Sequence, residues 1–147
     1  MVMDATDGRI IEQLRDNARA GYADIGDIVG LSASAVKRRI DRLVDSGAIR
    51  GFTVQVDPAA EGVGVEAYVE LYCRGTVGPE ELRTILQAVP EVVYAGTVSG
   101  QADAILHMRA HSIPALEAAL EKVRQAPNVD HTRSSILLSR LVHRRIL

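Results

Sequence analysis

The spacing of apolar residues changes near residue 65 of this 147-residue chain, from a helical period to a strand-like period of two. Before that point, apolar residues recur three and four positions apart, as they do along the buried side of a helix. After it, Val65, Ala67, Val69, Leu71 and Cys73 alternate with tyrosine or charged side chains, as in a strand with one buried face. The chain is therefore expected to be an α+β protein with a helical N-terminal part and a C-terminal part built on a sheet.

The N-terminal part predicts three short helices. Asp4 and Asp7 have the spacing of a capping box before the first helix, and Ser32 is a suitable N-cap for the third. Gly30 is suited to end the second helix, because glycine readily adopts the left-handed conformation found there. Gly26 lies inside that helix, where glycine costs about 1 kcal/mol relative to alanine. We therefore expect another helix to cross closely at Gly26.

The third predicted helix has one apolar side and one basic side. Residues 32–50 contain five Lys or Arg and two Asp, a local charge of +3, whereas the whole chain has a net charge of −2. Its apolar stripe is formed by Val36, Ile40, Leu43 and Val44. A short helix with one buried side and one basic side fits a DNA major groove. Together with the preceding helix and the turn at Gly30, the pattern indicates a helix-turn-helix.

The candidate DNA-binding residues lie on or beside this third helix: Ser32, Ser34, Ala35, Lys37, Arg38, Arg39, Arg42 and Arg50. The N-terminal turn of a recognition helix enters the groove first, so Ser34, Ala35 and Arg38 are expected at base edges. The other cations are expected at phosphates, each adding roughly one unit to the salt dependence of binding. The alternative is a solvated helix face whose arginines pair with Asp41 and Asp45 in neighbouring turns.

A linking segment is expected between the two parts. Residues 52–56 predict a strand that is closed by Asp57-Pro58, and the small, glycine-rich residues 59–64 mark the domain boundary. The expected organisation is a helix-turn-helix domain over residues 1–50, a strand and hinge over 51–64, and a second domain over 65–147.

The second domain predicts elements in the order β-α-β-β-α-β. They are a strand from residue 65, a helix between Gly78-Pro79 and Pro90, strands over 92–99 and 102–110, a helix from Ser112 that stops before Pro127, and a long strand over 129–142. This order is the split βαβ, ferredoxin-like arrangement, with two helices on one face of an antiparallel sheet. The opposite face is bare in a monomer, and dimerisation is the simplest way to cover it.

The turn around Gly100 is a second candidate site. Backbone N–H groups in such a turn can form an anion-binding nest, which suits the carboxylate of a free amino acid. Asp103 offers the complementary charge for an ammonium group, and the hydroxyls of Thr132, Ser134 and Ser135 are expected to supplement either end. The alternative is a plain hairpin whose glycine serves the turn and whose aspartate bonds its own backbone.

Several classes of function are disfavoured by what the sequence lacks. It contains no nucleophile–base pair, phosphate-binding loop or dinucleotide fingerprint, so neither an enzyme nor a cofactor is expected. His107 and His111 are four residues apart, but a strand-to-helix transition between them opposes shared metal binding. Cys73, His131 and His143 have no ligand-like spacing, so no metal site is expected.

The sequence shows no recognisable targeting signal. The chain has no apolar run long enough for a membrane span, and its acidic start resembles neither a signal nor a transit peptide. The single cysteine fits a reducing compartment. A cytoplasmic protein without a membrane partner is therefore expected.

Short motifs distributed along the chain carry a family resemblance. They are Asp7 with Ile10-Ile11, Val29-Gly30-Leu31-Ser32, Arg39-Ile40-Asp41-Arg42-Leu43, Ser46-Gly47-Ala48-Ile49-Arg50-Gly51-Phe52-Thr53, Val98-Ser99-Gly100-Gln101-Ala102-Asp103 and Thr132-Arg133-Ser134-Ser135-Ile136. In this order they resemble the leucine-responsive regulator (Lrp)/AsnC family of prokaryotic transcription factors over essentially the whole chain. One departure is Ala102, where the family commonly has an aromatic residue.

The resemblance implies a winged-type helix-turn-helix domain joined to a ferredoxin-like, ACT-like βαββαβ domain. It also implies a homodimer that binds short inverted repeats in double-stranded DNA, often assembles into an octamer, and binds an amino acid at contacts between dimers. The expected function is a sequence-specific transcriptional regulator controlled by this effector. The effector-binding candidates are Val98, Ser99, Gly100, Gln101, Asp103, Thr132, Ser134 and Ser135.

Two other classes of function remain open at this point. One is a ligand-binding or structural oligomer whose helical part does not read DNA; it predicts weak, sequence-blind binding that salt abolishes. The other is a small enzyme built on the ferredoxin-like domain. This class is disfavoured because the sequence shows no convergent cluster of titratable residues.

Overall fold

The computed structural model describes residues 3–142 and divides the chain into two compact units, one ending at Gln55 and the other beginning at Val56. This division lies inside the linking segment expected over residues 51–64. His143, which the sequence analysis considered as a metal ligand, lies outside the described residues.

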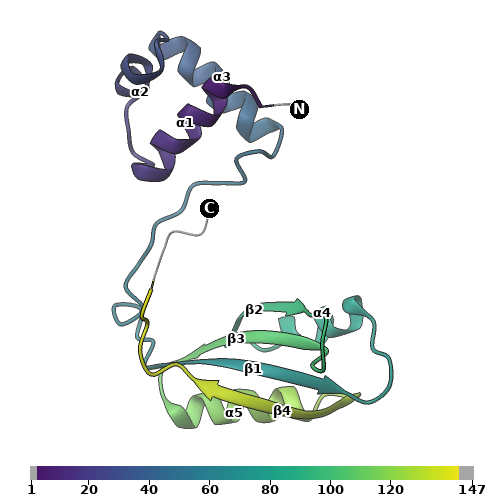
Figure 1. The fold of residues 1–147 in the computed structure, drawn as a ribbon. Helices are drawn as coiled ribbons and strands as arrows, with labels where there is room; N and C mark the ends of the chain where they lie inside the picture. The colour runs from purple at the N-terminus through teal and green to yellow at the C-terminus, as the bar shows by residue number, and fades with distance from the viewer. Residues whose placement is uncertain (1–2, 143–147) are drawn as a thin grey trace. The chain divides into compact units, whose positions relative to one another are not determined.

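The N-terminal unit consists of α1 (Ala5–Asp16), α2 (Tyr22–Val29) and α3 (Ala33–Asp45) (Figure 1). The predicted helix starts are confirmed. The Asp4 carboxylate accepts a hydrogen bond from the Asp7 N–H at 2.7 Å, and the Asp7 carboxylate accepts one from the Asp4 N–H at 3.2 Å. At α3 the Ser32 hydroxyl accepts a hydrogen bond from the Ala35 N–H at 3.3 Å. These caps satisfy donors that the first turn of a helix leaves unpaired.

The three helices bury one small apolar core. Its fully or nearly buried members are Ile10, Ile25, Val29, Val36 and Ile40, and Leu43 is also buried. The expectation that Val44 completes this stripe is wrong, because its side chain is 42% exposed. Val44 lies at the margin of the stripe, where it borders an open groove beside Phe52.

Two glycines shape the turn between α2 and α3. Gly30 has φ +78°, a left-handed conformation that ends α2 as predicted. A Cβ atom on Gly26 would overlap the carbonyl group of Leu31. The close neighbour of Gly26 is therefore the backbone of the turn and not, as expected, a crossing helix. Because this approach needs a residue without a side chain, Gly26 helps to fix the path by which the chain enters α3.

The strand predicted over residues 52–56 is not formed. Phe52, Val54 and Val56 alternate as in a strand, but their side chains are 55%, 81% and 47% exposed. A strand requires a neighbour to pair with its backbone N–H and C=O groups, and no described residue pairs with this segment. The period of two in this segment is therefore not accompanied by a paired strand.

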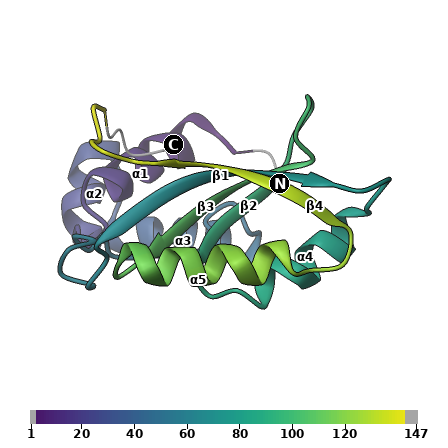
Figure 2. The same cartoon turned by 90° about the horizontal axis from the view of Figure 1, so that it is seen from below.

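The C-terminal unit has the predicted βαββαβ order. Its elements are β1 (Val65–Cys73), α4 (Pro79–Gln87), β2 (Val92–Thr97), β3 (Ala104–Ala110), α5 (Ile113–Arg124) and β4 (Val129–Ile136). The sheet is antiparallel with strand order β2-β3-β1-β4. Figure 2 shows α4 and α5 lying across one face of it. The ferredoxin-like fold predicted from the sequence is confirmed.

Inward-facing side chains of β1 and β3 form the core with the two helices. Val69 and Leu71 on β1 and Leu106 and Met108 on β3 have no exposed surface. Each alternates with residues on the opposite face, which the helices leave uncovered.

The last strand is shorter than the predicted range of 129–142. Ile136 pairs with Ala67, and the Leu137 N–H donates to the Glu66 carbonyl at 2.9 Å. Since β1 begins at Val65, residues beyond this point have almost no partner strand left. The end of β1 therefore sets the end of β4.

Candidate functional site

Arg38 is the exposed cation of α3 best placed for a ligand. It makes no hydrogen bond or ion pair with any residue that the structure describes. Ser34, one helical turn earlier, is also exposed, and its hydroxyl lies 3.1 Å from that of Ser32. Residues four apart share one side of a helix, so Ser34 and Arg38 face solvent together, away from the buried side of Val36 and Ile40.

Lys37 forms an ion pair along the same helix. Its ammonium group lies 2.6 Å from the Asp41 carboxylate, and both side chains are more than half exposed. The hydrogen bond to Asp41 raises the pKa of Lys37. Lys37 therefore pairs with an acid of the next turn, as expected for a solvated helix face. Exposed pairs of this kind are weak, and so Lys37 remains able to exchange Asp41 for a phosphate.

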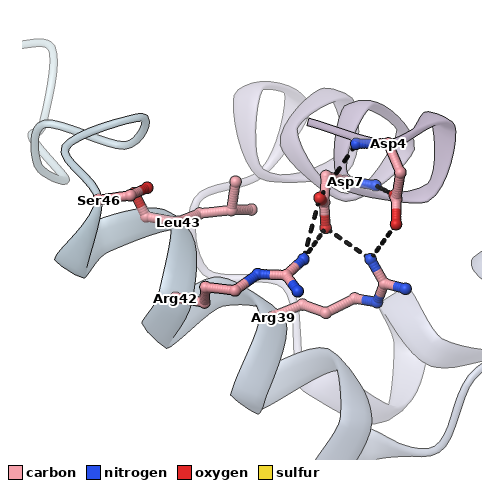
Figure 3. A network of polar contacts seen from close by, with 6 residues as sticks. All are labelled: Asp4, Asp7, Arg39, Arg42, Leu43 and Ser46. Carbon is pink, nitrogen blue, oxygen red and sulfur yellow. Dashed lines mark hydrogen bonds and ion pairs between the residues drawn. The ribbon is translucent and has the colours of Figure 1, made fainter. Parts of the chain in front are cut away.

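Arg39 and Arg42 contact the start of α1 (Figure 3). Nη1 of Arg39 donates to Asp4 and to Asp7, both at 2.7 Å. Nη2 of Arg42 lies 3.0 Å from both carboxylate oxygens of Asp7. The Asp7 side chain is only 1% exposed, while those of Arg39 and Arg42 are 26% and 51% exposed. A buried carboxylate thus has two arginine partners.

This network was missed by the sequence analysis. From the sequence, Asp7 is expected as a capping residue and as part of the family resemblance, and Asp41 and Asp45 are the acids expected to pair with the arginines. The observed partners are more than 30 residues away in the chain. The hydrogen bonds to Asp4 and Asp7 raise the pKa of Arg39, and the hydrogen bond from Arg39 lowers that of Asp4. Phosphate binding by Arg39 and Arg42 stays a prediction, since both guanidinium groups already contact carboxylates.

The turn between β2 and β3 is tied to the end of β1. Gly100 has φ +153°, which favours glycine. The Asp103 N–H donates to the Leu71 carbonyl at 2.9 Å, and the Asp103 carboxylate accepts a hydrogen bond from the Cys73 N–H at 2.7 Å. Burial and the nearby Asp103 raise the pKa of the Cys73 thiol. Asp103 therefore binds backbone, as the plain-hairpin alternative expects, but the backbone of β1 and not its own.

An open hollow of about 720 Å³ borders this turn. Its lining includes the predicted residues Val98, Ser99, Gly100 and Gln101, together with Glu70 and Arg133. Nε of Arg133 lies 3.9 Å from the Glu70 carboxylate. These two opposite charges were missed by the sequence analysis. The available signal was the period of two, which puts each on the uncovered face of its strand.

The three hydroxyl residues expected beside the turn do not share one face of β4. Ser135 pairs with Tyr68, and so it lies on the uncovered face. Thr132 and Ser134 pair with Leu71 and Val69, on the face that the helices cover. The Thr132 hydroxyl accepts a hydrogen bond from Arg124 of α5 at 3.0 Å. Thr132 and Ser134 therefore lie on the opposite face from Ser135, because successive strand residues alternate in direction, and none of the three lines the hollow beside the turn.

A charged cluster occupies the other end of the uncovered face. The Glu66 carboxylate lies 2.8 Å from Nε2 of His107, 2.9 Å from Arg140 and 3.4 Å from Arg109. Burial alone would raise the pKa of Glu66, but the hydrogen bond with His107 and the two arginines lower it. His107 also stacks on Tyr68, with ring centroids 4.8 Å apart. Within residues 3–142 no group of histidine, cysteine and acidic side chains could hold a metal ion.

The lowered pKa of Glu66 predicts an acid-sensitive C-terminal unit. The folded state favours the ionised carboxylate, so its stabilising contribution is complete above the ordinary pKa of 4.5 and is lost as pH falls through the lowered value. We expect the melting temperature of this unit to fall below about pH 4.5 more steeply in the wild type than in Glu66→Gln. Calorimetry over a pH series measures this; parallel curves for the two proteins would contradict it.

Comparisons with known proteins cover both units. Residues 3–44 match the AsnC-type helix-turn-helix domain, and residues 66–147 match the Lrp/AsnC ligand binding domain. The HTH-type transcriptional regulator Rv2324 of Mycobacterium tuberculosis is 49% identical over 142 residues, which cover 97% of this chain and 96% of that protein. The HTH-type transcriptional regulator LrpA of the same organism is 31% identical, with 93% and 91% covered.

Solved structures agree with this assignment. The structure of AsnC from E. coli has a TM-score of 0.91 at 26% identity, with 99% of each chain covered. The transcriptional regulator NMB0573 of Neisseria meningitidis, in its complex with L-Met, shares the fold with a TM-score of 0.88 at 24% identity, with 97% of this chain and 94% of that chain covered. Among residues 3–142, none of the helices combines the length and the apolar character that a membrane span requires. The chain belongs to the Lrp/AsnC family of transcriptional regulators, with a helix-turn-helix DNA-binding domain and a ligand-binding domain.

Proposed function

We propose that this regulator reads specific DNA sequences with α3. Ser34, Ala35 and Arg38 contact base edges in the major groove, and Lys37 and Arg50 contact phosphates. The observation that carries this proposal is the exposed Arg38, which lies opposite the buried side of α3 and has no partner among residues 3–142. A guanidinium group in this position has the donor geometry that recognises a guanine edge.

The same proposal places an amino-acid effector in the hollow beside the turn. Its carboxylate binds the N–H groups around Gly100 and the guanidinium of Arg133, and its ammonium group binds Glu70. Asp103 holds the turn against β1. The opposite charges in the hollow support a zwitterionic ligand, as does the match to a ligand-binding domain. The fold relative from Neisseria, which was solved with L-Met, adds support for an amino acid.

Assembly completes the mechanism. A homodimer forms through the uncovered face of the sheet, and dimers associate into an octamer with the effector at the contact between them. The hollow lies where this face meets the turn of Gly100, so a bound amino acid there reaches a neighbouring subunit. Binding then favours one arrangement of the α3 helices on DNA, because a ligand shifts an equilibrium only through its different affinities for the two states.

The effector is tested with a duplex that the wild-type protein enriches from a random pool. Each proteinogenic amino acid is added at fixed salt, and one is expected to change the affinity for this duplex by about 5- to 150-fold. Arg133→Gln and Glu70→Gln are expected to weaken the response, because each removes one charge from the hollow. Arg83→Gln, an exposed arginine of α4, is the control. The effector proposal fails if no amino acid alters either the affinity or the melting temperature of the wild type.

A further inference from the structure

We infer that Asp7 raises the sequence specificity of DNA binding by keeping Arg39 and Arg42 from binding phosphates. This inference rests on the proposed DNA-reading role of α3. It gives a function to the buried carboxylate that connects α1 and α3 in Figure 3.

Both oxygens of the Asp7 carboxylate accept hydrogen bonds. One oxygen accepts hydrogen bonds from Arg39 at 2.7 Å and from Arg42 at 3.0 Å. The other accepts from Arg42 at 3.0 Å and from the Asp4 N–H at 3.2 Å. With Asp4 also bonded to Arg39, two acids balance two arginines. A phosphate that approached the remaining N–H groups of these arginines would meet guanidinium groups whose charge Asp4 and the buried Asp7 already neutralise.

Arg39 and Arg42 lie on the helix that is proposed to enter the DNA groove, and so their pairing with Asp7 affects DNA binding. Arg42 lies one helical turn beyond Arg38 and two turns beyond Ser34, and so it borders the side of α3 that faces the bases. Its side chain is 51% exposed, within reach of a polyanion next to α3. Carboxylate and phosphate are both anions that suit the planar fork of a guanidinium group, so Asp7, which already neutralises these two groups, competes with a DNA phosphate as their partner.

Competition of this kind affects specificity more than it affects affinity. Phosphate contacts carry no sequence information and supply essentially all non-specific binding. Two more free arginines beside the reading residues would therefore strengthen binding to every duplex. The Asp7 network removes that contribution, and it also ties α3, which carries Arg38, to the start of α1. Asp7 is in this sense a positioning residue that does not itself touch DNA.

The test uses Asp7→Asn in the full chain, because asparagine keeps the shape and the oxygen acceptor for the Asp4 N–H. Binding to a random-sequence duplex is measured over a salt series. If the freed arginines bind phosphates, the slope of log affinity against log salt becomes steeper by about 1 to 2 units. The random duplex then binds about tenfold more tightly at ~0.1 M salt. The ratio of affinities for the enriched and random duplexes falls, because α3 is less firmly oriented.

Two further variants separate freed charges from damaged structure. Asp7→Asn combined with Arg39→Gln and Arg42→Gln is expected to return the slope to the wild-type value. Arg42→Gln alone keeps the Asp7–Arg39 pair and is expected to change the slope by well under one unit. If Arg42 already binds a phosphate, the same variant loses about one unit, which overturns the inference even if Asp7→Asn fails to fold.

The remaining outcomes are also decisive. A merely structural Asp7 predicts that Asp7→Asn lowers affinity for both duplexes together, with an unchanged slope and a lower melting temperature, and this result overturns the inference. Failure of the wild type to enrich any sequence would overturn the proposed DNA-reading function instead. The slope on the random duplex distinguishes these failures, because it is measured without an enriched sequence.

Discussion

Arg38→Ala is expected to lower the affinity for an enriched duplex by about 5- to 150-fold, while the affinity for a random duplex changes much less. The physical reason is that a bidentate contact to a base edge contributes about 1–3 kcal/mol of discrimination, which a phosphate contact does not provide. Arg38 is the α3 arginine that the structure leaves exposed and without a protein partner within residues 3–142. Gel shifts with both duplexes at one fixed salt concentration measure the two affinities.

The matched control for this substitution is Arg83→Ala. Arg83 is 59% exposed on α4 of the other unit and pairs only weakly with Glu80. Its loss is expected to leave the preference between the duplexes unchanged. Equal losses on both duplexes for Arg38→Ala would make Arg38 a phosphate contact and would contradict its role in base recognition.

Ile25→Ala is expected to unfold the N-terminal unit and abolish duplex binding while the C-terminal unit stays folded. Ile25 has no exposed surface and belongs to a core with few members. Truncating a buried isoleucine costs about 2–5 kcal/mol, which is comparable to the whole stability of a domain of about 50 residues. Calorimetry is expected to show the loss of one transition, and the transition of the C-terminal unit is expected to remain.

Ile28→Ala on the same helix serves as the control. Its side chain is 49% exposed, so its removal is expected to change the free energy of unfolding by no more than about 0.5 kcal/mol. A single concerted transition in the wild type, shifted as a whole by Ile25→Ala, would contradict the separation of the chain into two independently folding units.

Features with local physical causes were predictable from the sequence. The caps at Asp4 and Ser32 and the end of α2 at Gly30 depend on residues within one turn, and the structure contains all three. The β1 alternation and the order of the C-terminal elements were predictable for the same reason, since each element displays its own period. The family resemblance connected these local features into one fold.

Features that depend on distant partners were not predictable in this way. Residues 52–56 have the alternation of a strand, but no strand of the described chain pairs with them. Strand β4 ends where β1 has no further residues with which it can pair. The partners of Arg39 and Arg42 lie on another helix, and nothing in the local pattern indicates Asp7 as a buried acid. By contrast, the opposite directions of the Ser134 and Ser135 side chains could have been predicted, because successive residues of a strand point to opposite faces.

A crystal structure of the full chain with an enriched duplex would show directly whether α3 reads bases. We expect the first turns of α3 in the major groove, with the guanidinium group of Arg38 at hydrogen-bond distance from a base edge. An α3 helix that lies outside the groove, or an Arg38 that contacts only protein in the bound assembly, would contradict it.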